Sequence, residues 1–178
     1  MTFKELIALR RSHRKFTADE VAPDDLSLIL RAALMSPTSK SCRSWQFVVV
    51  DDPVRLRQIA DAKSLGGQFL AEAPLAVVVL GDGNTDDCWI EDCSIAAFAM
   101  QLQAADLGLA TCWVQMRGRG TTDGESAEAI VRGVLGIPDN LRVLCVVAVG
   151  HPAEERKPQN EERLKWENVH IDLFSSND

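Results

Sequence analysis

The sequence predicts one domain in which α-helices alternate with a sheet of four or five strands. The chain of 178 residues is 46% hydrophobic and 25% charged, which suits a single sizeable core. Segments with apolar residues at helical spacing alternate with short runs of β-branched and apolar residues, over connections of usual length. The runs predicted as strands are 45–50, 75–80, 110–116, 142–149 and, as the fifth, 169–174.

The predicted helices have recognisable start signals. Thr2 and Glu5 form a capping-box pattern before the first helix, and Asp52 precedes a proline at the start of the third. We expect Asp24 or Asp25 to cap the second helix. The predicted helical segments are 3–9, 26–34, 53–60, 69–73, 89–107 and 126–135.

The helix predicted over 89–107 is the longest, and its middle, residues 95–100, is apolar on nearly every side. Such a helix is either deeply buried or packed against a partner chain, and both alternatives remain open. Gly108 follows it as a natural C-terminal stop.

The composition changes after residue 152. Residues 153–168 are mostly charged or polar and predict an extended arm. Residues 169–174 then alternate in the manner of one more strand. A strand at the end of a polar arm must pair with a sheet edge, either in the same chain or in a partner.

Charge and cysteine content exclude several classes of protein. The formal net charge of -7 argues against nucleic acid, whose binding depends on many phosphate contacts. No apolar run is long enough to cross a bilayer, and charged residues near the start argue against an apolar leader. Five cysteines without a CxxC pair indicate free thiols in a reducing cytoplasm. We therefore expect a cytoplasmic protein that binds neither nucleic acid nor membrane.

Two polar segments are candidates for ligand binding. Residues 9–16, here called the arginine segment, concentrate Arg10, Arg11, Arg14 and a serine hydroxyl in an acidic chain. Guanidinium forks and a hydroxyl suit a phosphate monoester, whereas the alternative is a solvated helix end whose charges match the helix dipole. Residues 36–44, the hydroxyl loop, are either a surface loop or a polar cradle for a ligand.

No complete catalytic or metal-binding pattern is present. There is no GxSxG, and neither nucleotide-binding glycine signature is met. The acidic loop 81–88 lacks the glycine and glutamate of a calcium site, and we expect it to be solvated. Cys88, Asp92 and Cys93 offer too few thiols for a metal. Cys42 beside Arg43 is a candidate nucleophile, with an inert thiol as the alternative.

These absences predict that any catalysis belongs to a bound cofactor, with the protein supplying orientation and charge. The arginine segment and the hydroxyl loop together describe a cofactor with a phosphate at one end and a polar heterocycle at the other. At this point five motifs, in order along the chain, resemble those of the FMN-dependent nitroreductase family. The motifs are 10–16, 36–47, 106–113, 135–138 and 149–152.

The resemblance implies a set of FMN-binding residues. The arginine segment would hold the phosphate, ribityl and pyrimidine oxygens, and the partner subunit would contribute the hydroxyl loop. Backbone amides of the third strand would approach flavin N5, and the arm would supply a late basic residue. The implied residues are, in that order, Arg10, Arg11, Ser12 and Arg14; Pro37, Thr38, Ser39 and Ser41; Val114, Gln115 and Met116; and Arg163, with Lys165 an equal candidate.

The resemblance also implies an α+β fold with a mixed or antiparallel central sheet flanked by helices. Family members are obligate homodimers with FMN at the subunit interface and the C-terminal strand swapped onto the partner sheet. Residues 1–152 would be the FMN-binding core, and residues 153–178 the arm and exchanged strand of the same domain.

The implied chemistry is ping-pong hydride transfer. NAD(P)H would reduce flavin N5 and leave, and a nitroaromatic, quinone or related small molecule would then be reduced. This scheme needs no catalytic side chain and no metal, so none is assigned. The alternatives are a same-fold flavoprotein with other chemistry, such as flavin fragmentation or dehalogenation, and a non-enzymatic flavin-binding module.

The chain departs from the family pattern in the hydroxyl loop. Ser41 stands where the family usually has asparagine, and its shorter side chain reaches less far toward the flavin. Arg43 and Ser44 replace a usual Gln-Pro pair. We expect Arg43 to add positive charge near the ring and to favour an anionic substrate or the reduced flavin.

Overall fold

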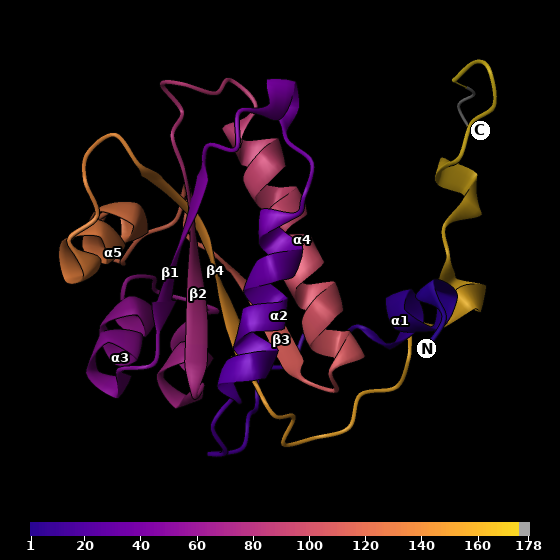
Figure 1. The fold of residues 1–178 in the computed structure, drawn as a ribbon, viewed down its shortest axis with the longest axis horizontal. Coiled ribbons are helices and arrows are strands. Elements are labelled where there is room, and N and C mark those ends of the chain that lie inside the picture. Colours follow the sequence, from indigo (N-terminus) through magenta and orange to yellow (C-terminus); the bar gives the residue numbers. More distant parts are fainter. Residues whose placement is uncertain (175–178) are drawn as a thin grey trace.

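A computed structural model of the chain describes residues 1–174 and confirms the α+β fold (Figure 1). Within these residues, four strands form one sheet in the order β1-β2-β4-β3, and every neighbouring pair is antiparallel. The strands are Trp45–Val50 (β1), Leu75–Gly81 (β2), Ala110–Gln115 (β3) and Arg142–Gly150 (β4). The α-helices are Phe3–Leu9 (α1), Pro23–Leu34 (α2), Pro53–Asp61 (α3), Trp89–Asp106 (α4) and Ala127–Leu135 (α5). Short 3₁₀ turns cover Ser39–Ser41 (η1), Gln68–Glu72 (η2), Glu161–Arg163 (η3) and Trp166–Asn168 (η4).

Helices cover both faces of the sheet, which explains why its inner strands are continuously apolar. Successive side chains of β2 point to opposite faces. Val77 and Val79 pack with α2 and α4, whereas Val78 and Leu80 pack with α3, η2 and α5. The molecule is therefore built in three layers with one apolar cluster on each side of the sheet.

The start signals of the helices are mostly confirmed. The capping box of α1 is complete, because the Thr2 amide donates to Glu5 Oε2 at 2.7 Å and the Glu5 amide to Thr2 Oγ1 at 3.3 Å. Asp52 caps α3 through the amides of the next turn. The expected cap of α2 is wrong. That helix begins at Pro23, so Asp24 and Asp25 lie inside its first turn, where they favour its positive end instead.

The long helix α4 is buried on one side only. Ala96, Ala97 and Met100 are fully buried in the cluster shared with α2. Ile95 and Phe98 on other sides of α4 are each 43% exposed. Phe98 and α1 line a groove of about 490 Å³ that the arm completes. One side of the helix is therefore deeply buried, and its other sides carry apolar side chains that the described residues cover only in part.

The arm leaves the core along α1 (Figure 1). The Gln159 amide donates to the Ala8 carbonyl at 2.8 Å, and Lys4 pairs with Glu161 at 3.4 Å. The strand predicted over 169–174 is not formed in the single chain, because no strand among residues 1–174 lies beside it to accept its backbone hydrogen bonds. Pairing within the chain is thus absent from the described part, and pairing with a partner stays a prediction. Residues 175–178 of the predicted arm lie outside the described residues.

Candidate functional site

The arginine segment lies along β3, the edge strand of the sheet. Ser12 forms a parallel bridge with Thr111, and the His13 amide donates to the Thr111 carbonyl at 2.9 Å. Phe16 forms a further bridge with Pro152. The unpaired backbone groups of an edge strand explain why an extended segment settles there. The structure therefore brings the predicted residues of the arginine segment and of β3 together, although they are about a hundred residues apart in sequence.

The three guanidinium groups have different surroundings. Arg11 donates to the carbonyls of Lys157 and Pro158, and so ties the arm to the core. The Arg14 guanidinium carbon lies 6.0 Å from the centroid of the Phe69 ring. Among residues 1–174, no carboxylate lies within ion-pair distance of Arg10 or Arg14. These two cations can therefore meet an external anion.

The electrostatics of nearby groups agree with this placement. Burial raises the pKa of the Cys112 thiol on β3, and the charges of Arg14 and Arg10 act in the opposite direction. Burial also lowers the pKa of His13, and Arg156 adds to that effect. Burial is the larger of these two causes. The buried Nδ1 of His13 has no hydrogen-bond partner among residues 1–174.

The end of β3 presents one backbone amide toward this edge. Backbone groups of successive residues in an antiparallel strand point alternately toward and away from the neighbour. The Thr111 carbonyl faces the arginine segment, so the Gln115 amide faces the same side. The Met116 amide donates instead to the Leu144 carbonyl of β4 at 3.2 Å. The side chains of Val114 and Met116 are buried in the core, so only backbone atoms there could meet a ligand.

The hydroxyl loop lies far from the arginine segment of the same chain. The Ser39 amide donates to Asp92 in the first turn of α4, whereas β3 follows the other end of that helix. The 18 residues of α4 span roughly 27 Å at 1.5 Å per residue. The structure therefore does not bring Pro37, Thr38, Ser39 and Ser41 to the arginines within one chain (Figure 1).

The remaining predicted positions are exposed. Arg163 lies in η3, whose Glu161 pairs with Lys4 of α1, and Lys165 follows two residues later. Cys42 is exposed in the hydroxyl loop, whereas Cys93 and Cys145 are buried, and all five cysteines are free thiols as predicted. Burial raises the pKa of Cys93 to about 12, so it stays protonated and unreactive.

The acidic loop 81–88 is only partly solvated, which corrects the expectation from its composition. Asp86 is 2% exposed, and its carboxylate accepts from Ser44 Oγ at 2.7 Å and from the Cys88 amide at 2.9 Å. Ligand atoms of Asp86, Asp87 and Cys88 lie within 4.8 Å of one another. Asp86 is already bonded to the protein, and Asp87 pairs with Lys40 at 3.2 Å.

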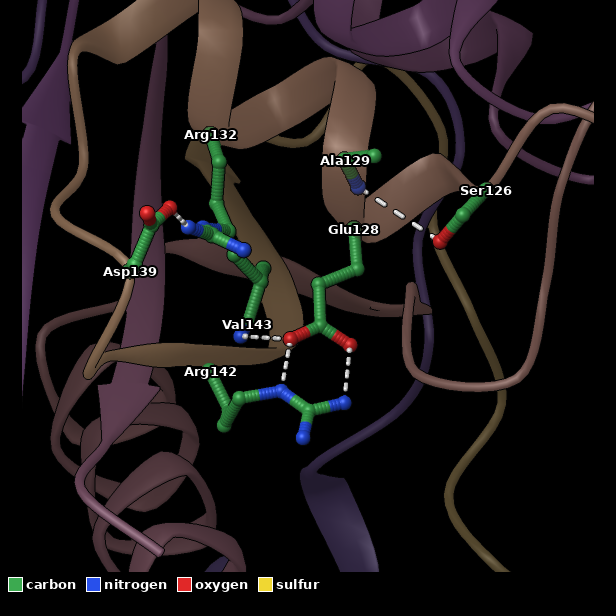
Figure 2. A network of polar contacts seen from close by, with 7 residues as sticks. All are labelled: Ser126, Glu128, Ala129, Arg132, Asp139, Arg142 and Val143. Atoms are coloured by element: carbon green, nitrogen blue, oxygen red, sulfur yellow. Dashed lines mark hydrogen bonds and ion pairs between the residues drawn. The ribbon is translucent and has the colours of Figure 1, made fainter.

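A second charged cluster joins α5 to β4, and sequence patterns gave no sign of it. Figure 2 shows the buried Glu128 facing Arg142, whose Nη2 donates to Glu128 Oε2 at 3.2 Å. Arg142 Nε donates to Oε1, which also accepts from the Val143 amide at 3.3 Å. Arg132 pairs with Asp139 beside it. Each of the two arginines has a carboxylate partner, so this cluster joins α5 to β4.

No helix among residues 1–174 has both the length and the apolar character needed to cross a membrane.

The sequence pattern of the nitroreductase family matches residues 7–68 and 60–151, which include the arginine segment, the hydroxyl loop and β3. The chain belongs to the nitroreductase family.

Several known proteins resemble the chain over most of its length. A solved FMN-dependent nitroreductase from Clostridium difficile R20291 has a TM-score of 0.92 and 42% identity, covering 95% of this chain and 98% of that one. A protein from Archaeoglobus fulgidus, provisionally named NADH dehydrogenase/NAD(P)H nitroreductase, is 31% identical over 91% of this chain and 97% of its own length. A 5,6-dimethylbenzimidazole synthase from Rhodospirillum rubrum is 25% identical over 91% of this chain and 87% of its own.

Proposed function

We propose that this nitroreductase-family chain is an FMN-dependent oxidoreductase that uses NADH or NADPH to reduce a nitroaromatic, quinone or related acceptor. The single observation that carries the proposal is the pair Arg10 and Arg14, which lie by the edge of β3 and have no carboxylate partner among residues 1–174. Support also comes from the relatives, because one is described as an FMN-dependent nitroreductase and another as an NAD(P)H nitroreductase.

The donor set fits FMN. Two guanidinium groups suit its phosphate, since each can give parallel charge-assisted hydrogen bonds. Ser12 adds a hydroxyl and Gln115 an edge-facing amide, while Arg163 or Lys165 would add charge from the arm. When bound, FMN supplies the hydride chemistry, and the protein holds it and tunes its ring by nearby charge.

The proposed active form is a homodimer with FMN at the interface and the C-terminal strand exchanged. A second copy would bring its hydroxyl loop to the arginine segment, which the single chain does not do. The exposed Phe98, Trp166 and Phe174 supply apolar surface for such an interface. β1 is the sheet edge that the arginine segment leaves open, and residues 169–174 of a partner would pair there.

Arg43 is the proposed source of preference for an anionic acceptor or the reduced flavin. It is exposed in the hydroxyl loop, with a backbone φ of 50°. Arg43→Gln should raise KM for acidic acceptors and lower the flavin potential. An unchanged substrate profile together with an unchanged potential would remove this role.

The proposed function is tested by colour and turnover. The purified protein should be yellow, release FMN on denaturation, and oxidise NADH or NADPH when given a nitroaromatic or quinone. A colourless protein that refuses added FMN would contradict the proposal. A protein that binds FMN without turnover would instead be a flavin-binding module. The cytoplasmic location stays a prediction from the free cysteines.

A second candidate is a same-fold flavoprotein with different chemistry, such as flavin fragmentation or dehalogenation. The resemblance to a 5,6-dimethylbenzimidazole synthase favours considering fragmentation. Incubation with reduced FMN and oxygen, followed by chromatography, distinguishes it. Appearance of 5,6-dimethylbenzimidazole as FMN disappears would favour this candidate, and intact FMN would favour the oxidoreductase.

A further inference from the structure

Two aspartates beneath the hydroxyl loop are almost completely buried. Asp86 is 2% exposed and Asp92 is 3% exposed. Both Asp92 oxygens lie within hydrogen-bond distance of the Ser39 amide, at 3.0 and 2.9 Å. Asp86 accepts from the Ser44 hydroxyl at 2.7 Å. The two carboxyl groups therefore hold the loop at two points.

The loop between these two points has a conformation that needs such support. Lys40, Ser41 and Arg43 have φ values of 51°, 56° and 50°, in the left-handed region that non-glycine residues adopt at a cost. A local hydrogen bond, in which the Arg43 amide donates to Thr38 Oγ1 at 3.2 Å, closes the loop on itself. Such a backbone persists only where the surrounding structure fixes it. The two aspartates supply the fixed points from outside the loop.

The titrations of the two aspartates depend on each other. Ionised carboxylates only accept hydrogen bonds, so Asp86 and Asp92 can bond to each other only when one of them is protonated. Burial raises the pKa of Asp92, and the charge of Asp86 adds to this. Burial opposes ionisation of Asp86 as well, but the bonds from Ser44 and Cys88 outweigh it and lower its pKa. Asp92 therefore takes up a proton more readily than Asp86 does.

Few other ionisable groups face the pair. Lys40 of η1 lowers the pKa of Asp86, and Glu91 on α4 raises that of Asp92. Cys93 stays protonated, as its burial requires. Asp87 pairs with Lys40 on the exposed side of the loop, where an ion pair contributes little.

We propose that Asp86 and Asp92 are positioning residues that hold the hydroxyl loop in the conformation in which it contacts the flavin of a second copy. The inference rests on the proposed function, because the loop has this task only if FMN binds at the dimer interface. Protonated Asp92 can donate to Asp86 while it accepts from the Ser39 amide. Removing the proton places two adjacent negative charges in a buried site, which favours release of the loop.

The first experiment follows the loop directly, in the full-length protein stripped of flavin. Hydrogen exchange should show Asp92→Ala losing protection at residues 37–44, and its dissociation constant for FMN should rise roughly tenfold or more. Asp92→Asn should restore both, because its carboxamide can donate to Asp86 and accept from Ser39. Glu91→Gln, which removes a carboxyl group from the exposed neighbouring position, is the control and should behave as wild type.

The second experiment uses pH, and it remains decisive if Asp92→Ala fails to fold. The dissociation constants of wild type and Asp92→Asn for FMN are compared from about pH 5 to about pH 9, across the ordinary and raised carboxyl range. Their ratio cancels the titration of the phosphate itself, which lies near pH 6. The dissociation constant of wild type divided by that of Asp92→Asn should rise with pH, because only wild type can ionise the carboxyl group of residue 92.

The outcomes separate this inference from the proposed function. Wild type that binds FMN, with equal affinity and loop protection in Asp92→Ala, overturns the positioning role and leaves the proposed function intact. If this ratio stays constant with pH, the claim that a proton on Asp92 helps to hold the loop is wrong. Wild type that binds no FMN overturns the proposed function and the positioning role together.

Discussion

The arginines by β3 and those between α5 and β4 have opposite environments. Arg142 and Arg132 each meet a carboxylate, as Figure 2 shows, and the bonds of Glu128 end in the sheet itself. Arg10 and Arg14 meet none among residues 1–174. The chain has 26 acidic and 19 basic residues, so carboxylates are in excess and the difference is local. Paired arginines stabilise the fold here, whereas the unpaired ones are available to a ligand.

The largest expected effect is on the unpaired side. Arg14→Ala should weaken FMN binding roughly tenfold to a hundredfold, because a charge-assisted hydrogen bond to phosphate contributes roughly 1.5–3 kcal/mol. The melting temperature should change little, since Arg14 is exposed and lies over the Phe69 ring. Flavin content and thermal melts measure the two effects. Equal flavin content in mutant and wild type would rule out this role of Arg14.

The converse effect is expected on the paired side. Glu128→Ala should lower the free energy of unfolding by roughly 1–3 kcal/mol, a value reduced because Arg142 is half exposed and its charge can be hydrated. FMN bound per folded molecule should not change. Urea unfolding and flavin titration check this. If Glu128→Ala lost FMN affinity but kept normal stability, the paired arginines would not differ in role from the unpaired ones.

A smaller effect concerns pH within the arginine segment. Because the pKa of His13 is lowered in the folded state, its contribution to stability is present above the ordinary value of 6.5 and is lost as pH falls. Melting temperatures should therefore drop more between about pH 7 and pH 5 in wild type than in His13→Gln. Saturating FMN should lessen the drop, since its phosphate offsets the surrounding positive charge. Parallel melting curves for the two proteins would show that His13 contributes nothing.

The smallest effect is expected at Asp139. Its side chain is fully exposed, so the pair with Arg132 should contribute little to stability. Asp139→Asn should leave both urea unfolding and FMN affinity close to wild type. A large loss of stability would show that an ion pair in this cluster stabilises the fold even when its carboxylate is exposed.

Local signals in the sequence were sufficient for most elements. The capping box at Thr2 and the apolar runs of β2 and β4 depend on neighbours within a few residues, and they are confirmed. The arginine segment was recognisable because its charges are clustered within six residues. The family resemblance implied that this segment and β3 both approach the flavin, but composition says nothing of which strand becomes an edge.

Contacts between distant segments could not be predicted. Ser39 and Asp92 are 53 residues apart, and Glu128 and Arg142 are 14 apart, so no periodic pattern links them. Asp86 lies in a stretch whose polar composition indicated a solvated loop, yet tertiary packing buries it. The strand predicted over 169–174 has the right alternation, but a strand also needs a neighbouring edge, which the single chain does not give it.

The most direct test of the account compares FMN with riboflavin, which differs only in lacking the phosphate. Wild type should bind FMN at least roughly a hundredfold more tightly, and Arg14→Ala should lose most of that difference. Equal affinity of wild type for the two flavins would contradict the claim that the unpaired arginines by β3 hold a phosphate.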